Sequence, residues 1–284
     1  MQERFHQRLL PVLFCAALVA LSLSLSVAEP RFAASKTGGD VGEFHAVSRK
    51  KVPTLLRKRR TTKPLLAAAT ALPVSILPAV NQEGIGREHQ FLANRTLRAL
   101  PDGCRKNLKH FFVRYDNPAE RGLGGKTTII LDGTVPDTEF TALLTHECGH
   151  VIHGNLTGSP DAKPSVFQDG QEVFTKDSPV VSFFAISWSD AATQKRGAQS
   201  ADFISGYAKT DVFEDFAETF AAYALQRSYI EERAKDNAAI RAKLSWMERQ
   251  FPLAPNAVGS TTYTSTVSIP WDITKLPFVL AKEG

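Results

Sequence analysis

Apolar and polar positions along the chain follow two different periods, which predict a domain that mixes helices with strands. Residues 86–99 are predicted as a helix. Two short runs rich in β-branched and aromatic residues, 110–115 and 127–131, are predicted as strands, with a turn-rich stretch at 117–125 between them. Another helix is expected to begin at Asp137 as its N-cap, because an apolar stripe at helical spacing follows that residue.

The pattern continues in the second half of the chain. Further strands are predicted around 173–174 and over 180–188, after a connection rich in glycine and proline. Long helical stretches are expected from about residue 211 and over 231–249. Because the strands come mainly before these helices, the order favours an α+β domain with a small mixed sheet. The sequence contains no internal repeat.

The two ends of the chain do not follow this pattern. Residues 1–28 combine a short basic start, an apolar stretch and small residues before Glu29, which is typical of a signal peptide. Residues 29–80 are rich in Ala, Thr, Pro and basic residues, and predict a disordered basic linker or a pro-segment. The folded domain is therefore expected over 81–255, with a C-terminal extension over 256–284.

The predicted signal peptide indicates an exported protein, either periplasmic or extracellular. The alternative is an uncleaved N-terminal anchor, because signal and anchor sequences differ mainly in the length of the apolar stretch. No later segment offers the roughly 18 uninterrupted apolar residues that a membrane span needs. Stable membrane insertion of the mature chain is therefore not expected.

The formal net charge of +5 raises the question of nucleic-acid binding, which depends on where the charge lies. Residues 29–66 carry a surplus of seven positive charges and the signal segment carries one, which leaves −3 for residues 67–284. The predicted domain therefore lacks the basic surplus that a nucleic-acid-binding face requires, and we expect no nucleic-acid partner.

The most specific feature of the sequence is His-Glu-Cys-Gly-His at 146–150, within the helix predicted from Asp137. Residues four apart share one helical face, so the imidazoles of His146 and His150 can converge on one metal ion. Glu147 lies between them, where its carboxylate could take a proton from water activated by that ion. The motif therefore predicts half of a catalytic metal site.

A catalytic zinc ion usually has three protein ligands and one open position, so a third ligand is needed. One candidate is local, because His153 shares a helical face with His150. The metzincin pattern would require glycine at position 153 and histidine at 156, whereas this chain has His153 and Leu156. Three ligands from one straight helix also suit a tetrahedral site poorly. We therefore interpret His153 as a rim or surface histidine.

The other candidate lies in the segment 207–218, where Glu214 and Glu218 share a helical face with Ala217. The small alanine would let this helix lie close against another one. Two carboxylates on a close-packed face need partners, because burial of an unpaired charge is costly; a metal ion and a metal-bound histidine would serve. The alternative is that Asp211 is an N-cap and Glu214 the acid of a capping box, which leaves Glu218 unexplained.

Together, the 146–150 motif and the 207–218 segment resemble the catalytic domain of anthrax lethal factor and its relatives among the gluzincin zinc metallopeptidases. The likeness covers about residues 85–250 and is specific at the motifs only. It implies a zincin-like fold with one catalytic Zn²⁺ ion. It also implies the following roles: zinc ligands His146, His150 and Glu214, general base Glu147, oxyanion stabiliser Tyr207, and Glu218 as the acid that orients a ligand histidine.

The resulting expectation is an exported gluzincin-type metalloendopeptidase that acts on a protein or peptide substrate. The alternative from another class is a catalytically inactive secreted module that keeps a zincin-like scaffold for binding. For Tyr207 the alternative is a packing residue at the start of a helix. A long insert, 164–190, separates the two motifs, so the resemblance does not carry over the identity of the substrate, and the sequence indicates no oligomeric state.

Two cysteines follow the predicted signal peptide, Cys104 and Cys148. A pair of cysteines in an exported protein often forms a disulfide, but Cys148 lies on the predicted metal helix, on the side facing the core. We interpret it as a small buried apolar residue, with a Cys104–Cys148 disulfide as the alternative.

Overall fold

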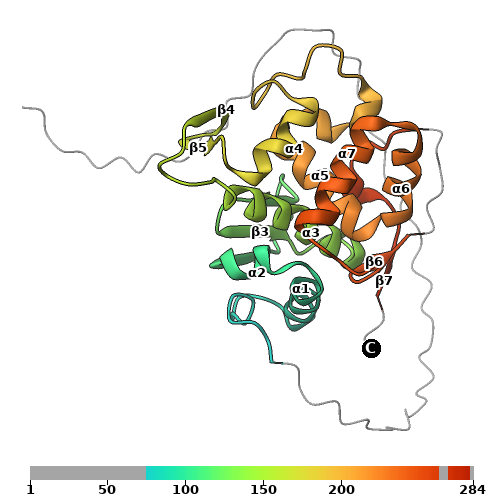
Figure 1. Ribbon diagram of the computed structural model, residues 1–284. Coiled ribbons are helices and arrows are strands. Elements are labelled where there is room, and N and C mark those ends of the chain that lie inside the picture. The colour runs from blue at the N-terminus through green and yellow to red at the C-terminus, as the bar shows by residue number, and fades with distance from the viewer. Residues whose placement is uncertain (1–74, 262–267, 282–284) are drawn as a thin grey trace, which may run out of the picture. The chain divides into compact units, whose positions relative to one another are not determined.

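A computed structural model describes residues 75–261 and 268–281. They form an α+β arrangement in which a small mixed sheet packs against one side of a group of helices (Figure 1). The predicted signal peptide and the linker up to residue 74 lie outside the described residues, so export stays a prediction. Residues 75–80 belong to the fold, because Val80 is fully buried and the Leu77 amide donates to Asn94 Oδ1.

The N-terminal part of the domain supplies the sheet. Its elements are α1 (Arg87–Ala99), α2 (Asp102–Asn107), β1 (His110–Arg114), β2 (Gly122–Gly124) and β3 (Thr128–Asp132). In the described part of the chain, β3 lies between β1, which is parallel to it, and β2, which is antiparallel. The predicted helix at 86–99 and the strands at 110–115 and 127–131 are confirmed. The short strand β2 was not predicted, because Gly-Leu-Gly has low strand propensity.

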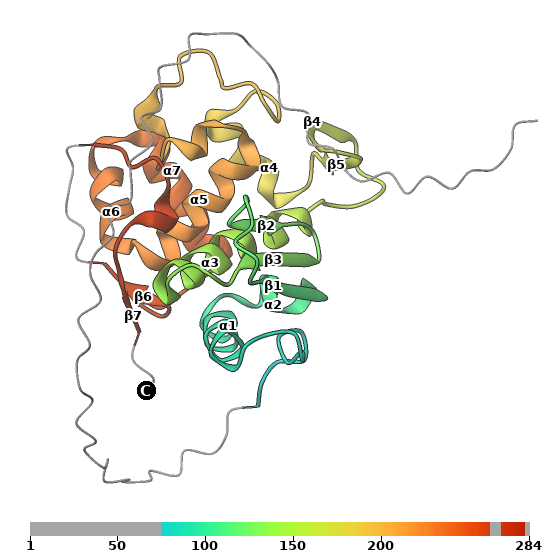
Figure 2. The same ribbon diagram turned by 180° about the vertical axis from the view of Figure 1, so that it is seen from behind.

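The helix α3 (Asp137–Gly154) runs between the sheet and the later helices (Figures 1 and 2). It packs on β2 and β3 with one face and on α5 (Val212–Leu225) with another. Its N-cap is Pro136 rather than Asp137, so the predicted start was one residue late. Asp137 is the first helical residue instead, where its negative charge stabilises the N-terminal end of the helix dipole.

The segment after α3 forms a hairpin and a helix: β4 (Pro164–Asp169), β5 (Glu172–Thr175) and α4 (Pro179–Ser187). The predicted strand at 173–174 is confirmed, but the one at 180–188 is wrong, because those residues form α4. Its buried side chains recur at helical spacing, at Val180, Phe183, Phe184 and Ser187. Proline at the first position favours a helix start, and a short apolar run cannot by itself distinguish a strand from a helix.

The C-terminal helices are α5, α6 (Arg227–Asp236) and α7 (Ala238–Gln250). The stretch predicted as one helix over 231–249 is divided at Asn237, whose side chain accepts from the Ile240 amide and caps α7. The helix α5 begins after Asp211, which accepts hydrogen bonds from the amides of Phe213 and Glu214. Close approach of α3 and α5 requires small residues, since a Cβ atom on Gly149 would lie 2.7 Å from Ala217 Cα.

The last described residues return to the helices. Their elements are β6 (Gly259–Ser260), η3 (Ile273–Lys275) and β7 (Val279–Leu280). Earlier in the chain, the short helices η1 (Ser200–Asp202) and η2 (Tyr207–Lys209) precede α5. Segment 268–281 packs against α5: Ile273 is fully buried, and Gln226 at the end of α5 donates to the Leu276 carbonyl. Residues beyond 255 thus contribute to the core of the same compact unit.

Two buried interactions fix the helices that carry the candidate site. Lys243 on α7 donates to both carboxylate oxygens of Asp215 on α5, at 2.6 and 2.8 Å, and both side chains are fully buried. Cys104 on α2 forms a disulfide with Cys148 on α3, so the interpretation of Cys148 as an unbonded apolar residue was wrong. The sequence pattern did not predict α2 and so could not place Cys104 against α3. None of the described helices is long and apolar enough to cross a membrane.

Candidate metal centre

The helix α3 brings three possible metal ligands to one point. Ligand atoms of His146, Glu147 and His150 lie within 4.8 Å of one another, so this group could hold a metal ion. The imidazole rings of His146 and His150 lie 5.1 Å apart, centre to centre. All three side chains are largely buried, so they are shielded from bulk water.

Glu214 on α5 completes this arrangement from a second helix. Its Oε2 atom lies 3.2 Å from His146 Nε2 and 3.5 Å from His150 Nε2. Ligand atoms around a tetrahedral ion, with bonds of about 2.0–2.1 Å, are separated by roughly 3.3 Å. Oε2 is also a buried atom without a hydrogen-bond partner among the described residues. A cation bound between these three groups would satisfy that oxygen, so the residues fit a metal ion.

The charges of these groups are strongly coupled. Burial alone would raise the pKa of Glu214, but the adjacent His146 and His150 rings hold it well below its usual value. Burial alone would lower the pKa of both histidines, but the Glu214 carboxylate raises the pKa of His150, and Glu214 with Glu218 raises that of His146. The centre therefore favours positive charge, whether it comes as a proton or as a metal cation.

Glu218, one turn further along α5, lies behind His146. Its Oε1 atom is 3.0 Å from His146 Nδ1, and its Oε2 atom accepts a hydrogen bond of 2.9 Å from the Ile273 amide. The carboxylate is fully buried, yet both oxygens have partners. Such a contact fixes the orientation of the imidazole, with Nε2 turned toward Glu214. The capping-box alternative also holds in part, since Asp211 caps α5, but it does not involve Glu218.

The Glu147 carboxylate lies beside the two histidines and against the edge strand β2. A Cβ atom on Gly122 would overlap its Oε1 atom, and one on Gly124 would lie 2.6 Å from Oε2. Only glycine at these two positions leaves room for the carboxylate, which is 4% exposed. Burial raises the pKa of Glu147 more than the nearby His146 and His150 lower it. The sequence analysis did not identify these glycines, because a Gly-x-Gly pattern in a turn-rich stretch does not indicate contact with a residue as distant in sequence as Glu147.

Tyr207 lies at the start of η2, beside Glu214 and His146. Its hydroxyl donates a hydrogen bond of 3.1 Å to Glu214 Oε1, and its ring centre is 6.1 Å from that of His146. Burial and the adjacent Glu214 carboxylate raise its pKa, so the phenol keeps its proton. The C-terminal segment fixes its backbone, because the Tyr207 amide donates to the Trp271 carbonyl at 2.7 Å. No pattern in the sequence indicates this contact.

His153 differs most from its prediction. It is 1% exposed, so its interpretation as a rim or surface residue was wrong. Burial lowers its pKa well below the usual value, which makes the ring neutral at neutral pH. Its Nε2 atom lies 3.1 Å from His150 Nδ1, which is the ring nitrogen that faces away from Glu214. The rings that cover it come from β5, α4 and α5, namely Phe174, Phe184, Phe213 and Phe216.

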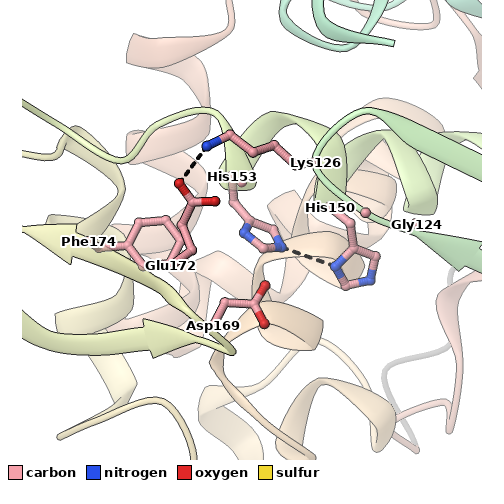
Figure 3. Close-up of a pocket in the computed structure, with 9 residues that line it drawn as sticks. Gly124, Lys126, His150, His153, Asp169, Glu172 and Phe174 are labelled. Atoms are coloured by element: carbon pink, nitrogen blue, oxygen red, sulfur yellow. Dashed lines mark hydrogen bonds and ion pairs between the residues drawn. The ribbon is translucent and has the colours of Figure 1, made fainter. Parts of the chain in front are cut away.

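A pocket of about 140 Å³ opens beside His150 and His153, between the loop after β2 and the β4–β5 hairpin (Figure 3). Lys126 and Glu172 form an ion pair of 2.5 Å across its rim. The carboxylate of Asp169, at the tip of the hairpin, has no hydrogen bond or ion pair with any other described residue, and burial raises its pKa. The hairpin therefore places one carboxylate without a partner close to the candidate centre.

Comparisons of the chain with models of protein families, with curated proteins and with solved structures find no match. The class of the site therefore rests on its own geometry. That geometry defines a possible metal centre at which one helix contributes two histidines and a second helix contributes a carboxylate.

Proposed function

We propose that the chain is a zinc-dependent peptidase of the gluzincin type, built on a zincin-like domain. The observation that supports it most is the convergence of His146 Nε2, His150 Nε2 and Glu214 Oε2, at separations of 3.2 and 3.5 Å. Two imidazoles and one carboxylate are the protein ligands of many catalytic zinc ions, which keep the fourth position for water or substrate. They are also the ligand types that the resemblance to the lethal factor-like family implies.

Bound zinc would polarise a peptide carbonyl group and lower the pKa of a water molecule to about 7. The Glu147 carboxylate would take the proton of the attacking water and pass it to the leaving nitrogen. Its raised pKa suits this role, because a general base works best when its pKa approaches the working pH. The Tyr207 hydroxyl, which keeps its proton, would donate a hydrogen bond to the carbonyl oxygen as negative charge develops there.

The surroundings of the centre favour an extended peptide as the substrate. In the described part of the chain β2 pairs with β3 on one side only, and its other edge is available to a further strand. The glycines of this strand touch the Glu147 carboxylate, so a peptide aligned along β2 would pass close to the proposed base. The pocket beside His150 is about as large as an engineered cavity of ~150 Å³ that holds benzene. It would accept one side chain, and Asp169 favours a basic one.

The decisive experiment is the substitution Glu147→Gln, which removes the base and keeps all three ligands. Hydrolysis of casein or of a fluorogenic peptide library should fall about 10²- to 10⁴-fold, while metal analysis should still find one zinc ion per chain. Glu88→Gln, an exposed glutamate on α1, is the matched control. Full activity of the Glu147 variant would refute the mechanism. A wild-type chain that binds zinc but hydrolyses nothing would support the inactive binding module instead.

A further inference from the structure

We infer that His153 is a positioning residue for His150. Its neutral ring accepts the Nδ1–H proton of His150 and thereby keeps Nε2 of that histidine aimed at Glu214. The inference rests on the proposed metal site, and it assigns a role to a residue outside the ligand set. It also explains why a histidine occupies a place that is otherwise lined by phenylalanine.

A histidine that binds a metal ion with one nitrogen normally donates its other N–H group to a fixed partner. For His146 that partner is Glu218. For His150 the atom facing Nδ1 is His153 Nε2, at 3.1 Å (Figure 3). One of two such nitrogens must donate and the other accept. Because the lone pair of His150 Nε2 points to the ligand position, its proton lies on Nδ1, and His153 Nε2 is the acceptor.

The surroundings of His153 hold its ring in this orientation. It stacks on Phe213, with ring centres 5.1 Å apart and planes inclined by 18°, and Phe216 meets it edge-on at 5.7 Å. Its position three residues after His150 on the same helix fixes the two rings relative to each other. The acceptor is therefore preorganised, and little motion is left by which the His150 ring could rotate away from Glu214.

The cost of burying this histidine supports a role beyond packing. Its Nδ1 atom is buried and has no hydrogen-bond partner among the described residues. A buried polar atom without a partner costs about 1–3 kcal/mol. Leucine or phenylalanine would fill the same aromatic surroundings without that cost. The bond from His150 is the contact in the described structure that an apolar side chain could not replace.

The test compares His153→Leu with His153→Gln. Leucine has a similar volume but leaves His150 Nδ1–H without an acceptor, whereas the glutamine amide oxygen can reach it. By competition with a chelator, zinc affinity should fall about 10- to 100-fold in the leucine variant and stay within about threefold of wild type in the glutamine variant. His110→Leu, which removes an exposed histidine on β1, should leave the affinity unchanged. Unchanged affinity in His153→Leu, or an equal loss in both variants, would overturn the inference.

A second readout examines the hydrogen bond itself. In ¹⁵N-histidine-labelled protein, the Nδ1–H proton of His150 should exchange slowly with water in wild type and quickly in His153→Leu, with or without zinc. A wild-type protein that binds zinc without hydrolysing peptides would refute the proposed function but leave the affinity test of His153 intact. The affinity test fails if wild type binds no zinc or if the leucine variant does not fold. In either case the wild-type spectrum tests the inference, and rapid exchange of the His150 Nδ1–H proton overturns it.

Discussion

His146 and His150 lie four residues apart on α3, but the groups behind their rings differ in charge. His146 faces Glu218, a buried carboxylate that also accepts the Ile273 amide from the C-terminal segment. His150 faces His153, a neutral ring enclosed by phenylalanine side chains. A charged partner raises the basicity of the imidazole and so strengthens its bond to a metal, whereas a neutral partner fixes only its orientation. We therefore expect His146 to be the stronger ligand of the two.

The largest effect is expected from Glu218→Leu, which removes the charged support. The substitution leaves His146 Nδ1–H and the Ile273 amide buried without an acceptor. Loss of one partner of a buried pair costs about 3–5 kcal/mol, so the unfolding free energy of the metal-free protein should fall by about that amount. Zinc affinity should fall further than in His153→Leu, because both orientation and basicity are lost.

Glu218→Gln separates these two contributions, since it keeps an acceptor oxygen and removes only the charge. Its zinc affinity should lie between those of wild type and Glu218→Leu. Urea denaturation and chelator competition measure the two quantities. If Glu218→Leu proves milder than His153→Leu in zinc affinity, the comparison between charged and neutral support is wrong.

The sequence predicted the ligand side of this comparison because its signals are local. The two histidines share a face of α3 through their spacing alone. Glu214 and Glu218 were predicted to need partners because they share a helical face with the small Ala217, and Gly149 does approach Ala217 in the structure. Each of these inferences depends on positions within one helical turn. The separate roles of Glu214 and Glu218 were implied by the resemblance.

Apart from Glu218, the supporting residues depend on contacts between distant segments, and the sequence did not predict those contacts. His153 was interpreted as a rim or surface residue once it was set aside as a ligand, because no local pattern showed that Phe174 and Phe184 would cover it. The cradle of Gly122 and Gly124 around Glu147 and the amide of Ile273 behind Glu218 join segments that no local pattern connects. Spacing along a helix predicts which groups can bind a metal, whereas the tertiary packing decides what holds them.

His153 and His146 should also contribute to the pH dependence of stability in opposite directions in metal-free protein. The pKa of His153 is well below its unfolded value of about 6.5. Below that pH the unfolded chain binds a proton that the folded chain does not, so stability falls by up to ~1.4 kcal/mol per pH unit. The pKa of His146 is raised, so its contribution is present below about pH 6.5 and is lost as pH rises through the folded value.

Urea denaturation of chelator-treated protein at pH 7.5, 6.5 and 5.5 measures this difference. Relative to wild type, His153→Gln should lose less stability between pH 6.5 and 5.5, because it removes the group that must stay neutral when buried. Glu218→Gln should instead change the pH dependence of stability between pH 6.5 and 7.5, because it removes a carboxylate that raises the pKa of His146. Parallel profiles for wild type and His153→Gln would show that His153 is not held neutral in the folded state.

The smallest effect is expected from Asp169→Asn, which tests whether the His150 side of the site also contacts substrate. Partly exposed ion pairs contribute about 0.2–1 kcal/mol, so kcat/KM for peptides with lysine or arginine beside the cleaved bond should fall about two- to fivefold. The Asp169→Asn variant should hydrolyse the same peptides with norleucine at that position as fast as wild type does. Asp161 is an exposed residue before the hairpin, and the control Asp161→Asn should hydrolyse both peptide sets like wild type. An equal loss for both peptide sets would mean that Asp169 acts on the centre itself. Zinc affinity should not change, because in the described structure no hydrogen bond or ion pair joins the Asp169 carboxylate to His153 or Glu218, which hold the histidine rings.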